Sequence, residues 1–336
     1  MFNNKTIFVT GGTGSFGNKF VEIISKKFKP KKLIIFSRDE YKQFNMQNKF
    51  PVKKFPFLRF FLGDVRDLER LKTAMRGADY VVHAAALKQV PSAEYNPIEF
   101  VKTNIYGAEN IINAAIQCEV KKVVALSTDK AANPINLYGA TKFASDKLFI
   151  TANNIVGKQN TFFSVVRYGN VLGSRGSVVP YFYEFLKNNN FLPITHKSMT
   201  RFWITLEQGV EFVIKSFQRM SGSELYVPKI PSVKITDLAK AMAPGVRLKT
   251  IGIRPGEKIH EIMCPNETAH LTYEFKDHFV IGSEDRKFKN NEFIKNKLGE
   301  KGKKVNKNFE FNSSKNKLLS LQEIKKLNDN LEIDSL

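Results

Sequence analysis

One short stretch of the chain, residues 127–142, carries several side chains that could take part in acid–base chemistry. It reads Ser-Thr-Asp-Lys-Ala-Ala-Asn-Pro-Ile-Asn-Leu-Tyr-Gly-Ala-Thr-Lys. A hydroxyl, a carboxylate, an amine and a phenol are supplied by Thr128, Asp129, Lys130 and Tyr138. Lys142 follows Tyr138 by four positions, so a helix would present both on one face. This spacing indicates dehydrogenase-like chemistry, with the phenol as proton-transfer group.

Alternating strand and helix patterns must position this stretch. Apolar, β-branched runs predict strands at Thr6–Thr10, Lys32–Phe36, Leu58–Leu62, Tyr80–His83, Val123–Leu126 and Phe162–Val166. Helical patterns separate them, including Pro97–Ala115 and Tyr138–Asn153. The alternation predicts an α/β fold with a doubly wound parallel sheet of the Rossmann type, and ligands at the carboxyl ends of its strands.

The alternation weakens beyond residue 172, which suggests three parts. We expect an NADP-binding domain at 1–172 and a smaller, mainly substrate-binding region at 173–284. A lysine- and asparagine-rich extension at 285–336 ends in an amphipathic segment, Leu318–Leu331, in which we see no chemistry.

A glycine-rich turn follows the first predicted strand. The chain reads Thr-Gly-Gly-Thr-Gly-Ser-Phe-Gly and then enters a helical pattern. Strand, glycine turn and helix together form the context of a dinucleotide fingerprint, although the spacing is G-x-x-G-x-x-G. Backbone amides and the helix N-terminus would hold a pyrophosphate. The predicted contacts are Gly11, Thr13, Gly14, Ser15, Phe16 and Gly17.

The end of the second strand decides which dinucleotide fits. Ser37 and Arg38 come first after the strand, and Lys42 could add a second positive charge. An arginine there suits a 2′-phosphate, whereas an acid suits a free 2′-hydroxyl, so we predict NADP. Asp39 keeps NAD open, because a one-residue shift would favour it.

The next two strand ends add further cofactor contacts. Asp64 could accept from an adenine amine or cap the following helix, and Val65 lies beside it. Ala84 and Ala86 are small enough to let the backbone pass close to the cofactor. Lys88 is placed to meet a phosphate or the substrate. We expect His83 and Asn104 to be structural polar residues.

Predicted contacts in the second half lie in loops. Val171 is expected at the cofactor, and the substrate contacts are Asn170, Arg175, Arg201, Arg254 and Glu257. Arg201 and Arg254 could each grip a diphosphate bidentately or form an ion pair between domains, and the sequence leaves both possibilities open.

Composition narrows the class of protein. The chain has 336 residues and a formal charge of +21, yet no clustered nucleic-acid motif, so we predict no nucleic-acid partner and a field that attracts an anionic small molecule. No apolar run is long enough for a membrane span. The cysteines, Cys118 and Cys264, fit a reducing, cytoplasmic location. Histidine spacing predicts no metal site.

Longer motifs resemble the extended short-chain dehydrogenase/reductase superfamily, in its nucleotide-sugar branch. These are T-G-G-T-G-S-F-G, Tyr138-x-x-x-Lys142 and Arg254-Pro-Gly-Glu. S-R-D-E at 37–40, A-A-L-K at 85–88, R-Y-G-N-V-L-G-S-R-G-S-V at 167–178 and M-T-R-F-W-I-T at 199–205 resemble a narrower group. Together with residues 127–142, they are similar to inverting UDP-N-acetylglucosamine 4,6-dehydratases of pseudaminic acid synthesis for flagellin glycosylation.

The resemblance implies a reaction and residue assignments. NADP would take a hydride from sugar carbon 4 and return it to carbon 6 after water has left. Tyr138 would take the 4-hydroxyl proton, Thr128 would hold the 4-oxygen, and Lys142 would hold the nicotinamide ribose and favour the phenolate. Asp129 and Lys130 would serve as acid and base, which requires a lowered Lys130 pKa. The product would be UDP-2-acetamido-2,6-dideoxy-beta-L-arabino-hex-4-ulose.

Several alternatives remain at this point. C5-epimerising dehydratases of capsule or O-antigen synthesis act on the same substrate, and some lack the tyrosine found here as Tyr138. A UDP-sugar 4-epimerase would not need the Asp129–Lys130 pair. A non-enzymatic alternative is an NADP-sensing nucleic-acid-binding protein. By analogy we also expect a homo-oligomer, either a dimer or a hexamer.

Overall fold

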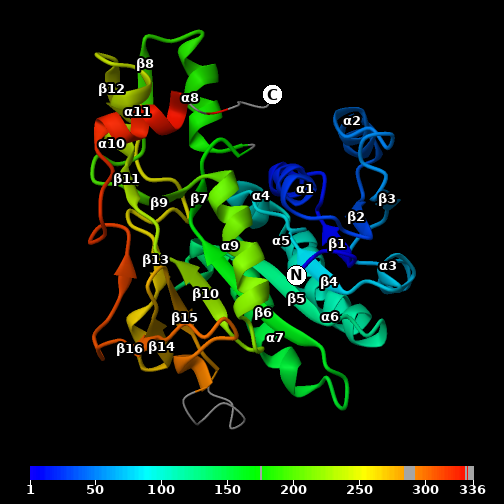
Figure 1. The fold of residues 1–336 in the computed structure, drawn as a ribbon. Coiled ribbons are helices and arrows are strands. Elements are labelled where there is room, and N and C mark those ends of the chain that lie inside the picture. Colours follow the sequence, from blue (N-terminus) through cyan, green and yellow to red (C-terminus); the bar gives the residue numbers. More distant parts are fainter. Residues whose placement is uncertain (175, 284–291, 330, 332–336) are drawn as a thin grey trace.

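A ten-stranded sheet runs through the protein in the order β16-β14-β15-β10-β6-β5-β4-β1-β2-β3 (Figure 1). The computed structural model describes residues 1–174, 176–283, 292–329 and 331. The strands are β1 (Thr6–Thr10), β2 (Lys32–Ser37), β3 (Leu58–Leu62), β4 (Tyr80–His83), β5 (Lys122–Thr128), β6 (Phe162–Tyr168), β10 (Leu225–Pro228), β14 (Thr272–Glu274), β15 (His278–Ile281) and β16 (Lys303–Lys304).

The predicted Rossmann topology is confirmed. Strand β1 pairs in parallel with both β2 and β4, so the strand order reverses between β1 and β4. A reversal of this kind opens a crevice at the carboxyl ends of the strands. The sequence pattern missed the other edge of the sheet, where β15 pairs antiparallel with β10 and β14, and β14 with β16.

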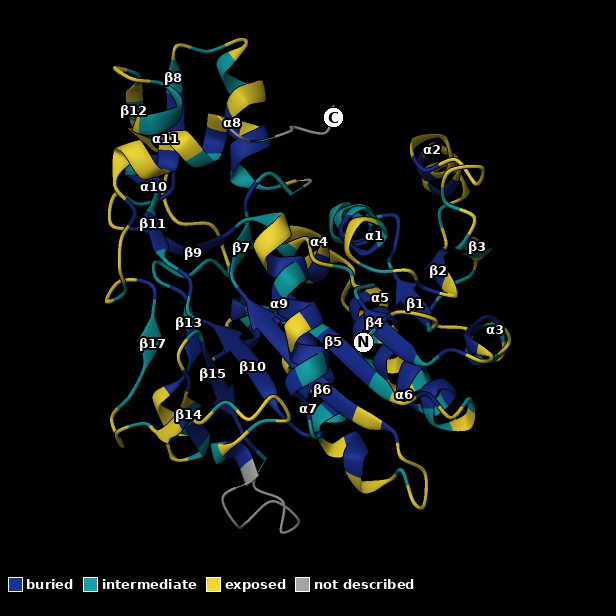
Figure 2. Ribbon diagram, in the orientation of Figure 1, coloured by how far each residue is buried: buried dark blue, intermediate teal, exposed yellow. Residues whose placement is uncertain are grey.

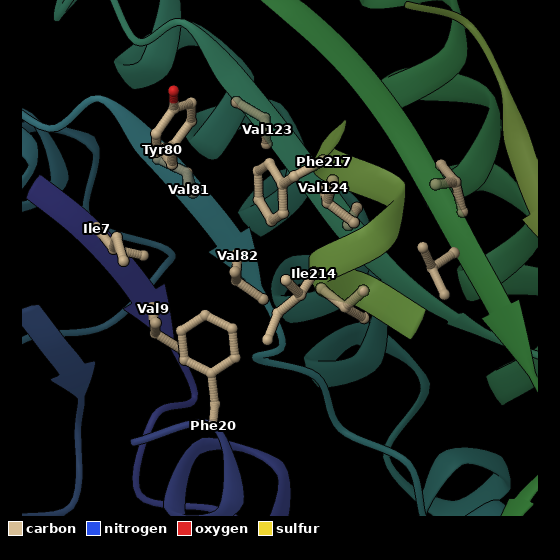
Figure 3. Packing of buried hydrophobic residues seen from close by; sticks show 14 of the residues in the cluster. Ile7, Val9, Phe20, Tyr80, Val81, Val82, Val123, Val124, Ile214 and Phe217 are labelled. Atoms are coloured by element: carbon tan, nitrogen blue, oxygen red, sulfur yellow. The ribbon is translucent and has the colours of Figure 1, made fainter. Parts of the chain in front are cut away.

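Helices cover both faces of this sheet. On one face, α1 (Ser15–Lys27) and α9 (Leu206–Arg219) set apolar side chains against the strands. Figure 3 shows Phe20 from α1 and Phe217 from α9 packing over Val9, Val82 and Val124. The other layer contains α3 (Leu68–Met75), α6 (Gly107–Gln117) and α7 (Leu137–Thr151), whereas α2 (Glu40–Lys49) is largely exposed (Figure 2). Fully buried aromatic side chains on the sheet supply much of the hydrophobic free energy of folding.

The helix predicted at 97–115 is interrupted in its first half. It consists of α5 (Pro97–Phe100), a π-helix over Val101–Tyr106 and then α6. Within the π-helix, the Asn104 amide bonds to the backbone N–H and C=O of Leu87 and to the Thr141 hydroxyl. The predicted structural function of Asn104 is confirmed, because this amide fixes the loop that follows β4.

A smaller lobe is built around its own apolar cluster, at the upper left of Figure 1. It contains α8 (Val178–Leu186), α10 (Ile235–Met242), α11 (Leu321–Asp329) and the strands β7 (Asn170–Val171), β8 (Phe191–Ile194), β9 (Thr200–Ile204), β11 (Ser232–Lys234) and β12 (Arg247–Thr250). Residues 173–284 contribute to both lobes, since α9, β10, β14 and β15 return to the large sheet.

The C-terminal extension crosses from the large lobe to the small one. After β16, strand β17 (Phe311–Asn312) pairs antiparallel with β13 (Ile262–Cys264). The predicted amphipathic segment is confirmed in α11, which buries Ile324 in the small lobe. Among the residues described, no helix has the length and apolar character needed to cross a membrane.

Candidate active site

A cleft of about 810 Å³ lies at the carboxyl ends of the parallel strands and extends to the small lobe. Nearly all of the residues predicted for the site line it. They are Gly11, Thr13, Gly14, Ser15, Phe16, Ser37, Arg38, Lys42, Asp64, Val65, Ala84, Ala86, Lys88, Thr128, Asp129, Lys130, Tyr138, Lys142, Asn170, Val171, Arg201, Arg254 and Glu257. Arg175 lies outside the described residues.

The glycine turn leaves the N-terminus of α1 open to an anion. Gly14 is the N-cap, no side chain caps the helix, and its first turn has no acidic residue. Gly11 has φ +62°, and a Cβ there would lie 2.8 Å from the Ala85 nitrogen. Gly17 does not line the cleft: a Cβ on it would lie 1.9 Å from the Gly12 carbonyl oxygen, so its size permits helix–strand packing. These features fit a dinucleotide pyrophosphate.

At the end of β2, the acid and the arginine are in different situations. Asp39 caps α2 by accepting from the Lys42 backbone at 2.9 Å, and its carboxylate also pairs with the Lys42 ammonium at 2.7 Å. The Arg38 side chain is 55% exposed at the cleft, and its guanidinium lies 3.6 Å from Asp64. The acid is thus engaged by its own helix, while the arginine faces the space where a ribose would lie.

Asp64 has partners that the sequence did not suggest. Asp67, not Asp64, caps α3, so the capping alternative for Asp64 is wrong. Asp64 instead accepts from the backbone and the guanidinium of Arg66, the latter at 2.8 Å. Partial burial would raise the pKa of Asp64, but the contacts with Arg66 outweigh it and leave this pKa below its ordinary value.

The acid–base groups lie where β5 passes into α7. Thr128 ends β5, a 3-10 helix over Asp129–Ala131 follows, and α7 begins after its N-cap Asn136. The Thr128 hydroxyl donates to Asp129 Oδ1 at 3.0 Å. Tyr138 and Lys142 are both buried on α7. Residues neighbouring in sequence therefore form one contiguous wall of the cleft.

Lys130 lies between two carboxylates. Its Nζ is 3.1 Å from Asp129 Oδ1 and 3.4 Å from Glu261 Oε1, and both carboxylates are almost fully buried. Burial would lower the pKa of Lys130, but these two negative charges raise it well above its ordinary value. The expectation of a lowered pKa is therefore wrong for this structure, because the sequence did not indicate Glu261.

Tyr138 and Lys142 are governed by burial. Burial raises the pKa of Tyr138 to about 12, against the opposing effects of Lys130 and Thr128. Lys130 is thus the cation that most favours the phenolate, whereas the sequence gave this function to Lys142. Burial lowers the pKa of Lys142, and the single carboxylate of Asp146 opposes it.

Arg201 is held by carboxylates from the following loop. Its guanidinium lies 3.4 Å from Glu257 and 3.8 Å from Glu261, and the residue is 6% exposed. The ion-pair alternative therefore describes Arg201 as it stands. Arg254 is exposed at the mouth of the cleft.

Sequence reasoning missed Asp146, Lys258 and Glu261. Asp146 follows Lys142 by four positions on α7, which was an available signal. Lys258 and Glu261 come from a distant loop and had none. The prediction that His83 is a core residue is confirmed: it is 1% exposed, it bonds to Thr10, and burial lowers its pKa to about 3. Within the described ranges, no cluster of histidine, cysteine and acidic residues could hold a metal ion.

Residues 7–283 match the family described as polysaccharide biosynthesis protein. The chain is 57% identical to a Campylobacter jejuni subsp. jejuni serotype O:2 protein named UDP-N-acetylglucosamine 4,6-dehydratase (inverting), and the match covers 95% of each. It is 40% identical to a Rickettsia akari protein named UDP-glucose 4-epimerase, over 97% of this chain and 96% of that one. The X-ray structure of Pen from Bacillus thuringiensis superposes with a TM-score of 0.88 at 35% identity, covering 99% of both chains. The chain therefore belongs to the polysaccharide biosynthesis protein family, and its resemblance to the inverting UDP-N-acetylglucosamine 4,6-dehydratases is confirmed.

Proposed function

We propose that this protein is a UDP-N-acetylglucosamine 4,6-dehydratase that inverts carbon 5. The observation that carries the proposal is the Asp129–Lys130 pair, at 3.1 Å, in one cleft with Tyr138 and a dinucleotide-binding turn. The relative with 57% identity and the same name supports it.

We infer that the cofactor is NADP. Gly11, Gly14 and the N-terminus of α1 would hold the pyrophosphate, and Lys142 the nicotinamide ribose. Arg38 supports NADP over NAD, because it is exposed at the cleft while Asp39 is engaged with Lys42. When bound, the nicotinamide accepts a hydride from the sugar and later returns it.

Tyr138 and Thr128 would serve the first step, oxidation at carbon 4. With a pKa of about 12, the resting Tyr138 is a protonated phenol, so the step requires the phenolate form to be reached in the complex. Lys130 favours that form, and the Thr128 hydroxyl is positioned beside the same groups to stabilise charge on the 4-oxygen. The resulting ketone makes the carbon-5 proton acidic.

The elimination would use the pair formed by Asp129 and Lys130. Transfer of one proton from Nζ to Oδ1, over 3.1 Å, converts the ion pair into a neutral amine and a carboxylic acid. The amine then takes the carbon-5 proton, and the acid protonates the 6-hydroxyl, which leaves as water. The ion pair is thereby regenerated, and Lys130 can return a proton to carbon 5 on the opposite face. Desolvation by the bound sugar favours the neutral pair.

A UDP-sugar would enter from the side of the small lobe. Arg254 at the mouth of the cleft is the better candidate for the diphosphate, since Arg201 is already paired with Glu257 and Glu261. Lys88 and Asn170 line the same space and would contact the sugar and its phosphates.

Incubation with UDP-N-acetylglucosamine tests the proposal. We expect a product lighter by one water, with no added NADPH. The alternative, a UDP-sugar 4-epimerase, is favoured by the name of the Rickettsia akari relative. Formation of UDP-N-acetylgalactosamine alone would support it and refute dehydration.

Two wider inferences follow from the same resemblance. We infer that the product feeds pseudaminic acid synthesis for flagellin glycosylation, which loss of that sugar from flagellin in a deletion strain would test. We also infer a homo-oligomer, because Tyr95, Ile98, Tyr106 and Phe143 are exposed on neighbouring helices. Sedimentation analysis would test this inference.

A further inference from the structure

Glu261 occupies an unusual position in the cleft. The residue is 2% exposed, yet it lines the same space as Lys130 and Tyr138. Its Oε1 lies 3.4 Å from Lys130 Nζ, on the side of the ammonium that Asp129 leaves open. Its Oε2 makes no hydrogen bond within the described residues, and Lys258 Nζ is 3.9 Å away. A buried carboxylate is costly unless charges compensate it, so this position requires an explanation.

The charged groups around this carboxylate come from four separate elements. Those facing Glu261 are Lys130, Asp129, Arg201 and Lys258. Tyr138 also acts on Lys130 from α7. Lys258 is itself tied to the Ala132 carbonyl at 2.6 Å, and Arg201 to the Ile259 and Thr200 carbonyls. Lys130 is thus the partner whose ammonium is held mainly by side-chain carboxylates.

The C-terminal extension fixes Glu261 from behind. The Ser313 hydroxyl accepts from the Glu261 backbone N–H at 2.9 Å, and the Ser313 N–H donates to the Glu261 carbonyl at 2.9 Å. The same hydroxyl lies 2.7 Å from Thr200 Oγ1, next to Arg201. Ser313 is fully buried, and the pairing of β13 with β17 continues directly from it. A segment that showed no chemistry in the sequence therefore reaches within one residue of two charged groups of the cleft.

We propose that Glu261 is a positioning residue for Lys130, which holds the Lys130 ammonium opposite Asp129, and that the C-terminal extension fixes this carboxylate through Ser313. This inference rests on the proposed dehydratase function. With Glu261 in place, Nζ has two fixed anchors and its proton is retained until the sugar enters. Without it, Asp129 alone holds the lysine, and the ammonium is easier to deprotonate.

Glu261→Gln tests the proposal, because it keeps the shape and removes the charge. We expect product formation to fall by roughly tenfold to a hundredfold, a part of what the whole acid–base group contributes. Cofactor reduction on adding substrate, and the KM for UDP-N-acetylglucosamine, should stay within about threefold of wild type. The pH at which product formation is half-maximal on the acid side should fall by about one pH unit or more, since a lost negative charge lowers the Lys130 pKa. The exposed Glu267→Gln is the matched control.

Two further variants keep the test decisive. Combined with Lys130→Ala, Glu261→Gln should change the rate of cofactor reduction by less than about twofold, because the two residues act as one unit. If Glu261→Gln does not fold, Ser313→Ala tests the same connection: we expect a loss of about two- to fivefold in product formation with normal cofactor reduction. Ser314→Ala, one position further and exposed, should behave as wild type.

The outcomes separate this inference from the proposed function. If the wild-type protein does not dehydrate UDP-N-acetylglucosamine, the proposed function fails. If it does, but Glu261→Gln and Ser313→Ala form product at the wild-type rate and pH, only this inference fails. Equal loss of cofactor reduction and dehydration in folded Glu261→Gln would also overturn it, since it would indicate a general structural function.

Discussion

The two buried lysines of the cleft have opposite electrostatic surroundings. Lys130 lies between the carboxylates of Asp129 and Glu261, and its pKa is raised. Lys142 has burial as its main influence and one opposing carboxylate, Asp146, and its pKa is lowered. That carboxylate is shared, because its Oδ2 also accepts from Ser127 at 2.6 Å and from Arg167 at 3.1 Å.

The difference shows that burial alone does not decide the state of a lysine. The number of carboxylates, and the other donors that each carboxylate serves, decides whether desolvation is compensated. Lys130 is stored as an ammonium that can supply a proton to Asp129. Lys142 is poised closer to neutrality and is suited to hold a cofactor hydroxyl. The first lysine belongs to elimination and the second to oxidation, and variants should separate them.

The largest effect is expected for Lys130→Ala. Product formation should fall by roughly ten thousandfold, the upper range for a lost acid–base group. Oxidation at carbon 4 should persist at a reduced rate, because Tyr138 and Lys142 remain. Stopped-flow absorbance of NADPH together with product analysis would measure both steps. Full dehydration by the variant would refute the assignment of Lys130 as base.

Lys142→Met should give the complementary pattern. Losing the ribose contact should lower carbon-4 oxidation by roughly a hundredfold and slow product formation equally, since elimination follows oxidation. The same absorbance measurement checks it, with cofactor affinity determined in parallel. Wild-type cofactor reduction in this variant would contradict the division of labour between the two lysines.

Arg38→Ala addresses the cofactor side of the cleft. Loss of a charged contact to a 2′-phosphate should weaken NADP binding by about tenfold or more and leave NAD binding nearly unchanged. Calorimetric titration with each dinucleotide measures this difference. Arg76→Ala, exposed at the end of α3 and outside the cleft, serves as control. Equal losses for both dinucleotides would move 2′-phosphate recognition to another residue.

The smallest effect is expected for Asp146→Asn. Asp146 raises the pKa of Lys142 against burial, so its loss lowers that pKa further. Activity that needs the Lys142 ammonium is present below its pKa and lost as pH rises. The alkaline limb of carbon-4 oxidation should therefore move to lower pH by about one pH unit. The exposed Asp329→Asn controls for charge. An unmoved limb in a folded variant would show that this lysine does not titrate there.

The sequence predicted what is local in the chain. The six parallel strands, the glycine turn and the wall from Thr128 to Lys142 follow from periodicity and spacing, because each lies within one or two consecutive elements. The protonation of Lys130 could not be predicted, since Glu261 approaches it only through the packing of the loop before β13.

The C-terminal extension shows the same limit from the other direction. Its composition indicated solvated lysines and asparagines, and only α11 was visible as a periodic pattern. The contacts of Ser313 with Glu261 and Thr200 depend on the pairing of β17 with β13, in strands too short to have a pattern of their own. Tertiary contacts between distant segments, not local propensity, complete the cleft.

The central claim is that Lys130 and Asp129 turn a carbon-4 oxidation into an elimination with inversion. The most direct measurement is NMR of the product formed from UDP-N-acetylglucosamine in deuterated water. We predict a 4-keto-6-deoxy sugar with the L-arabino configuration and deuterium at carbon 5. A product that keeps its 6-hydroxyl, or a 4-keto-6-deoxy sugar with carbon 5 in its original configuration, would contradict this account.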